Sequence, residues 1–235
     1  MKFFSLILAI SALAISHSSY CQAFIAAASN VPGNTPAWVE KTDGTVLEGT
    51  IQSSVMMNGA LRSIRLKDAE GVNYKLKADE VAFIKVKPGV LGKLDMMVEK
   101  SSSLAEMAQT NFDEIIDREW IYYEQILSPG KNPKPLLLQK VNPGFDERIK
   151  VYNDPNAAET GSLMSGDVTL TGGEDRSYIA VNEKGEAFYI RKASYDKKIR
   201  ELLSDCPYLL SKYEGQKMRF NDLAQHVYIY NTMCR

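Results

Sequence analysis

Glu124 is the carboxylate in this sequence that is best placed to do chemistry. It lies in a run, residues 119–127, that is apolar at both odd and even positions. On a strand, Glu124 shares one face with Trp120, Tyr122 and Ile126, because alternate side chains point the same way. Burial there would raise the pKa of the carboxyl group and suit it to acid or base catalysis. The alternative is a structural glutamate that pairs with an arginine or lies at a strand rim.

Histidine and cysteine are scarce, with 2 and 3 residues in the chain. His226 is a weak candidate for a catalytic base, and a packed structural histidine is the alternative. Cys206 and Cys234 both lie on apolar stripes of expected helices, where a buried thiol is a poor nucleophile. A disulfide between them is therefore favoured over a thiol at Cys206 that uses His226 as its base.

Oxygen-bearing side chains cluster in two polar turns, and they are weak calcium candidates: Asp154, Asn156, Glu174 and Asp175. Their spacing is not that of a calcium loop, and ordinary turns explain them equally well. The sequence contains no phosphate-binding loop, dinucleotide fingerprint, zinc-protease motif or serine elbow. It therefore predicts neither a cofactor nor a class of enzyme.

Charge is balanced, with 28 Lys and Arg against 29 Asp and Glu and a formal net charge of −1. This balance argues against bulk binding to nucleic acid or to an anionic membrane. Basic residues nevertheless concentrate on the N-terminal strands, where a candidate binding face comprises Arg65, Lys67, Lys75, Lys77 and Lys85. The alternative is a solvated strand face whose lysines prevent edge-to-edge aggregation.

Residues 1–23 are typical of an export signal. Lys2 supplies the positive start, an apolar run follows, and cleavage after Ala23 would leave small residues at the cut. A cut just before Gln22 is the second possibility. The apolar run is too short to span a bilayer. Lipid attachment at Cys21 is a rival interpretation, but the bulky Tyr20 stands where a small residue would be needed.

The segment 37–87 has the pattern of five short strands. Two hairpin turns are indicated, at Asp43-Gly44 and at residues 69–71, where glycine permits positive φ. Apolar residues occupy one parity and charged residues the other. We expect a small SH3-like or Sm-like barrel here, preceded by a flexible leader over residues 24–36.

The rest of the chain predicts three further segments. Residues 88–117 form a helical or irregular connector, and residues 118–192 form a second antiparallel β module. This module contains a long polar loop over residues 153–176, which is a candidate functional element. Residues 193–235 switch to a helical period and form a disulfide-clipped tail. The expected fold class is α+β and mostly β.

Short motifs spread over the chain carry a family resemblance: DGTVLEG at 43–49, NPGF at 142–145, VYNDP at 151–155, TGGED at 171–175, and DCP at 205–207 with HVY at 226–228 and Cys234. On these motifs the chain resembles a family of uncharacterised exported proteins of Gram-negative bacteria. The resemblance implies export, a β-rich body and a helical tail that carries cysteines. It implies no activity and no catalytic residue.

We therefore expect an exported, non-enzymatic protein that is periplasmic or secreted. Its β modules would bind a partner protein or an envelope component, or assist assembly at the cell surface, and nucleic acid is not an expected partner. Two alternatives stay open. One is a hydrolase of an envelope polymer that uses Glu124, and the other is an accessory subunit anchored by a lipid at Cys21.

Overall fold

The structure is a computed structural model of the chain. It describes residues 24–25, 28, 30–89, 93, 119–157, 163–165, 168–171 and 177–234. The expected export signal with Cys21, nearly all of the connector, and the candidate ligands Glu174 and Asp175 lie outside the described residues.

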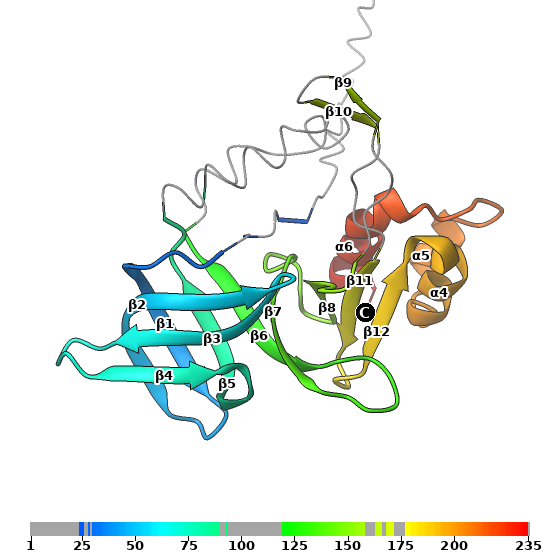
Figure 1. Cartoon of the computed structure of the whole chain (residues 1–235). Coiled ribbons are helices and arrows are strands. Elements are labelled where there is room, and N and C mark those ends of the chain that lie inside the picture. Colours follow the sequence, from blue (N-terminus) through cyan, green and yellow to red (C-terminus); the bar gives the residue numbers. More distant parts are fainter. Residues whose placement is uncertain are drawn as a thin grey trace, which may run out of the picture.

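The N-terminal part folds into an antiparallel sheet that closes on itself (Figure 1). Its strands are β1 (Thr35–Lys41), β2 (Val46–Met57), β3 (Ala60–Lys67), β4 (Asn73–Lys77), β5 (Val81–Val86), β6 (Ile121–Leu127) and β7 (Pro135–Gln139). The strand order is β2-β1-β5-β6-β7-β3-β4, and an additional pairing of β2 with β3 closes the barrel. The short 3-10 helix η1 (Ala78–Glu80) joins β4 to β5.

Tight turns at glycine set the register of the first hairpins. Gly44 and Gly71 adopt φ values of 83° and 89° in the two turns that the sequence predicted. A third turn joins β2 to β3 at Asn58-Gly59, where φ is 52° and 78°. Positive φ at both positions is the signature of a two-residue hairpin turn. The pairing of β2 with β3 leads up to this turn with register shifts between Ile51 and Ser53 and between Val55 and Met56.

The barrel extends beyond the expected boundary at residue 87. β6 pairs with β5 and with β7, and β7 reaches β3 through Ala60 and Leu61. β6 therefore belongs to the barrel and not to a separate second module. Its apolar character on both parities has a simple reason. Ile121 and Tyr123 fill the barrel interior, whereas Ile126 is covered from outside.

A second, smaller sheet packs beside the barrel. It has the order β12-β11-β8 and consists of β8 (Ile149–Asn153), β11 (Ser177–Asn182) and β12 (Ala187–Arg191). Two further strands, β9 (Leu163–Ser165) and β10 (Val168–Thr171), pair with each other. They lie inside the segment expected to be a loop without secondary structure, so that expectation is wrong for these residues.

The C-terminal part is helical, with α4 (Tyr195–Leu202), α5 (Pro207–Lys212) and α6 (Leu223–Met233). Short 3-10 turns precede the first and last of these, η2 (Lys192–Ser194) and η3 (Phe220–Asp222). Cys206 and Cys234 form the expected disulfide, with Cα atoms 5.3 Å apart. The mostly β fold with a barrel, a second sheet and a disulfide-clipped helical tail is thus confirmed.

Three apolar clusters hold these layers together. The first fills the barrel, and the second lies between the barrel and the second sheet and includes Leu138 of β7 and Ile179 of β11. The third lies between the other face of that sheet and the helices and includes Val151, Ile199 and Val227. Figure 1 shows the second sheet between the barrel and the helices.

The expected flexible leader is packed in the part that the structure describes. Phe24 stacks on Phe145 with ring centroids 6.3 Å apart. Ala28 and Val31 are buried, and the Ser54 hydroxyl donates to the Val31 carbonyl at 2.7 Å. Apolar residues within this Ala- and Ser-rich segment supply the contacts that fix it.

Candidate functional site

The outer surface of β1, β5 and β6 carries a group of aromatic and lysine side chains, which we call the aromatic–lysine face. Its members are Trp38, Phe83, Lys85, Lys87, Trp120 and Tyr122. They point outward because their neighbours on the same strands, such as Val39, Ile84 and Tyr123, fill the barrel.

Strand register places aromatic rings and ammonium groups alternately across this face. Trp38 lies opposite Lys85, and Lys85 lies opposite Tyr122. The Lys140 backbone N–H donates to the Tyr122 carbonyl at 2.9 Å, so Lys140 extends the row. The four residues therefore form a cross-strand row of ring, cation, ring and cation.

The ammonium groups lie over the rings. The Lys85 Nζ is 5.6 Å from the ring centroid of Trp38 and 5.0 Å from that of Trp120. The Lys87 Nζ is 5.2 Å from the Trp120 centroid. These are cation–π distances, and such contacts orient an ammonium group while leaving its N–H donors available.

The rings also contact one another. Trp38 and Phe83 meet at 5.7 Å with an interplanar angle of 70°, and Phe83 meets Tyr122 at 6.1 Å with an angle of 37°. All of these rings are half-buried. The face is therefore a continuous, ordered surface and not a set of isolated aromatic residues.

Lys85 and Lys87 form no ion pair with any residue that the structure describes. Two glutamates are nevertheless close in register, since Glu48 lies opposite Trp38 and Glu40 lies opposite Phe83. The face thus combines aromatic surface with ammonium donors and carboxylate acceptors at its margin.

Beside this face, at the edge between barrel and second sheet, lies a group of charged and polar side chains. This junction cluster comprises Glu124, Lys140, Asp146, Lys150 and Tyr152. Glu124 Oε1 accepts from Lys140 Nζ at 2.7 Å, and Oε2 accepts from Lys150 Nζ at 2.9 Å and from the Tyr152 hydroxyl at 2.6 Å. Lys140 also donates to Asp146.

The environment of Glu124 differs from the sequence expectation. Burial alone would raise its pKa, but the hydrogen bonds from Lys140, Tyr152 and Lys150 outweigh burial and lower the pKa. The expected raised pKa is therefore wrong, and Glu124 is an ionised acceptor with no proton to donate at neutral pH. Burial and the Glu124 charge together raise the pKa of Tyr152, which stays a hydroxyl donor.

His226 is buried among tyrosines on the inner side of α6. Its Nδ1 lies 2.6 Å from the Tyr195 hydroxyl, and its ring meets the Tyr213 ring at 4.7 Å with an interplanar angle of 83°. Burial lowers the pKa of His226 to about 4. With Cys206 engaged in the disulfide, no thiol is available to this imidazole, and the geometry is that of a packed structural histidine.

The calcium candidates that the structure describes form a turn. Asp154 accepts from the Asn156 backbone N–H at 2.9 Å and from the Ser177 hydroxyl at 2.6 Å, so both carboxylate oxygens have partners. Among the described residues no group of three or more metal-binding side chains is found. The turn alternative accounts for Asp154 and Asn156.

The expected basic face divides into two surfaces. Arg65 and Lys75 lie opposite each other on β3 and β4, and the exposed Lys67 and Lys77 flank them. Lys85 is on β5, which is not a neighbour of either strand. The grouping of Lys85 with the other four is therefore wrong, and its neighbours are Trp38 and Trp120.

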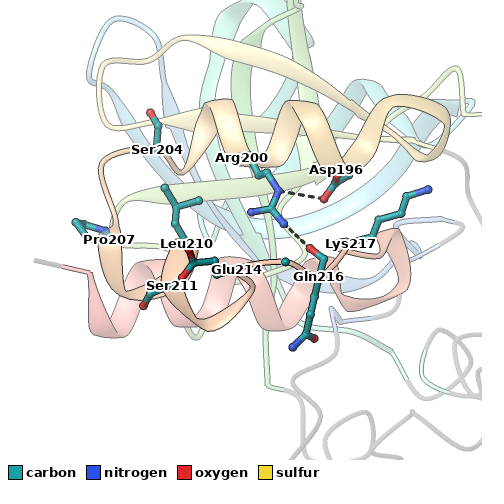
Figure 2. A pocket seen from close by; sticks show the side chains of 10 residues that line it. Asp196, Arg200, Ser204, Pro207, Leu210, Ser211, Glu214, Gln216 and Lys217 are labelled. Atoms are coloured by element: carbon teal, nitrogen blue, oxygen red, sulfur yellow. Dashed lines mark hydrogen bonds and ion pairs between the residues drawn. The ribbon is translucent and has the colours of Figure 1, made fainter.

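A surface hollow lies between α4 and the turn that follows α5 (Figure 2). Arg200 reaches across it. Its Nε donates to Asp196 at 3.2 Å, and its Nη2 donates to the carbonyls of Gln216 at 2.6 Å and Tyr213 at 3.1 Å. Because the Arg200 guanidinium is engaged in these bonds, it links α4 to the turn and has a structural role in this hollow.

No family model, curated protein or solved structure matches this chain. In the portion that the structure describes, the helices are all too short or too polar to pass through a bilayer. Sequence reasoning missed most of the aromatic–lysine face, because it assigned Trp120 and Tyr122 to a different module from Trp38 and Phe83. The readable signals were the i, i+2 pairs, Lys85 with Lys87 and Trp120 with Tyr122.

Proposed function

We propose that this chain is an exported, non-enzymatic binding protein of the bacterial envelope, and that the aromatic–lysine face is its binding surface. The observation that carries the proposal is Lys85, an ammonium group held over the rings of Trp38 and Trp120 without an ion-pair partner among the described residues. Ordered aromatic side chains beside unneutralised cations are the usual ingredients of a recognition surface.

Export is supported by two features. Residues 1–23 have the pattern of a cleavable signal, and Phe24, directly after the expected cut, stacks on Phe145. The disulfide between Cys206 and Cys234 suits an oxidising compartment.

The interpretation as a binding protein is supported by the surroundings of the two catalytic candidates. Glu124 is neutralised by lysines, and His226 is buried against Tyr195. Both therefore have structural partners that explain their presence.

The first test is localisation. The full chain, produced in a Gram-negative host, is fractionated, and the N-terminus and intact mass of the exported form are determined. We expect export, cleavage after Ala23 and no lipid at Cys21. Retention in the cytoplasm with residues 1–23 intact contradicts export, and a lipid mass on Cys21 supports the anchored alternative instead.

The second test is binding. Purified exported protein is sedimented with the isolated, insoluble cell envelope, and Trp120→Ala is compared with the double change Lys75→Gln and Lys77→Gln on the other basic surface. Loss of a central aromatic contact should weaken retention about tenfold, and the double change should leave it nearly unchanged. Equal retention of Trp120→Ala and wild type contradicts the assignment of this face.

A further inference from the structure

We infer that the aromatic–lysine face recognises an acidic polysaccharide, a polymer whose sugar rings carry carboxylate groups. This inference rests on the proposed function for the location of the surface, and adds the chemical class of the ligand.

The ammonium groups of Lys85 and Lys87 favour an anionic ligand with more than one charge. Lys85 lies on β5 and Lys87 directly follows its last residue, two positions further on, which separates their Cα atoms by about 7 Å in extended chain. Both ammonium groups lie about 5 Å from the Trp120 ring centroid, at 5.0 and 5.2 Å. One indole thus holds two cations side by side, an arrangement suited to successive acidic groups of a polymer.

The aromatic rings of this face favour a ligand that has apolar surface. Phe83 and Tyr122 lie between the lysines and the junction cluster, and with Trp38 they form a half-buried aromatic strip. The C–H faces of sugar rings pack on such surfaces through dispersion and burial of apolar area. A simple inorganic anion would leave this strip without a function.

The carboxylates at the margin select among anionic polymers. Glu48 lies opposite Trp38 and Glu40 lies opposite Phe83. Their oxygens can accept hydrogen bonds from sugar hydroxyls. Each sugar of a polysaccharide has free hydroxyl groups to donate, whereas the deoxyribose hydroxyls of a DNA strand are used up in its backbone. The face therefore favours a hydroxyl-rich acidic polymer over single-stranded DNA, although both offer rings and charge.

The sequence provides a reporter for this face alone. The chain contains 2 Trp residues, and both of them, Trp38 and Trp120, contact the Lys85 ammonium. Tryptophan emission therefore reports on the surroundings of the aromatic–lysine face.

The experiment titrates the purified exported chain with polygalacturonate while tryptophan emission is recorded. The neutral polymer pullulan and the oligonucleotide poly(dT) serve as competing probes. We expect a saturable change with polygalacturonate that is about tenfold weaker in the double variant Lys85→Gln with Lys87→Gln. The matched variant Lys75→Gln with Lys77→Gln removes the same charge from β3–β4's surface and should bind within about twofold of wild type. Far-UV circular dichroism confirms that each variant is folded.

The charge-preserving variant Lys85→Arg with Lys87→Arg should retain most of the binding, and this keeps the test decisive if the glutamine variant does not fold. Tighter binding of poly(dT) than of polygalacturonate overturns the inference in favour of nucleic acid. Binding of pullulan as tight as that of polygalacturonate also overturns it, because the acidic groups would then contribute nothing. Equal losses in the two glutamine variants show non-specific attraction and also overturn it. If envelope retention depends on Trp120 while polygalacturonate does not bind, the ligand class is wrong and the binding surface stands.

Discussion

Lys85 and Lys140 flank Tyr122 in one cross-strand row, yet they lie in opposite electrostatic surroundings. Lys140 is only 7% exposed and donates to Glu124 and Asp146. Lys85 is half-buried, lies over two indole rings and has no ion-pair partner in the described part of the chain. One residue type therefore serves two purposes at positions about 10 Å apart, which is two strand spacings.

The difference follows from desolvation. At the junction between barrel and second sheet, a charge loses most of its water and must be compensated by partners. On the outer face of β5, water still reaches the ammonium group, so its charge is not committed to the fold. Substitutions in the junction and helical layers should therefore change stability, whereas substitutions on the aromatic–lysine face should change binding.

The largest effect on stability is expected from removing the disulfide of the helical layer. Replacing both Cys206 and Cys234 with serine removes a cross-link over a sequence separation of 28 residues. The free energy of unfolding should fall by about 3.5 kcal/mol, because the unfolded chain gains loop entropy. Urea denaturation measures the difference, with reduced wild type as the control. A midpoint equal to that of the oxidised wild type would show that the bridge does not contribute.

The next effect is a pH dependence from His226 in the same layer. Its folded pKa of about 4 lies below the ordinary value of 6.5, so the unfolded chain binds the proton more readily. Stability is therefore complete above pH 6.5 and falls as the pH drops toward 4, by about 3 kcal/mol in total.

Urea midpoints at pH 7 and pH 5 measure this loss, and His226→Gln should flatten the curve between them. The lowered pKa of Glu124 acts in a separate window, below its ordinary value of 4.5, where protonation of the carboxylate costs stability. An unchanged slope in His226→Gln between pH 7 and pH 5 would assign the dependence to other groups.

A smaller loss is expected when the junction cluster is broken at its centre. Glu124→Gln removes the charge that compensates Lys140 and Lys150, and should lower the free energy of unfolding by about 2 kcal/mol. Glu119→Gln, at an exposed position just before β6, is the matched control and should stay within about 0.5 kcal/mol of wild type. Glu124→Gln also tests the hydrolase alternative, which predicts lost turnover of an envelope polymer with unchanged stability.

Local signals in the sequence predicted much of the fold. The turn at Asp43-Gly44 and the stripe of α4, with Tyr195 and Ile199 buried, depend on neighbours in the chain. The closure of the barrel by β6 and β7 was missed, because the alternation of one strand does not specify which strand it pairs with. Asn58-Gly59 is a local hairpin signal that the sequence prediction left unused.

The candidate site was less predictable for the same reason. The apolar neighbours of Glu124 on its own strand were readable, and they suggested a raised pKa. Its compensating cations, Lys140 and Lys150, come from beyond β7 and from β8, so the direction of the shift followed from tertiary pairing. Lys85 was assigned to a basic face on similar grounds, before its aromatic neighbours from β1 and the start of β6 were in place.

The smallest effect on stability is expected on the aromatic–lysine face, in the double variant Lys85→Gln with Lys87→Gln. Only cation–π contacts with Trp38 and Trp120 are lost, which should lower the free energy of unfolding by less than about 1 kcal/mol. Urea denaturation followed by circular dichroism checks this, since tryptophan emission itself will change in the variant. A loss as large as that of Glu124→Gln would place these lysines among the groups that hold the barrel together. A small loss combined with weakened binding would mean that their charge is kept on the surface for a ligand.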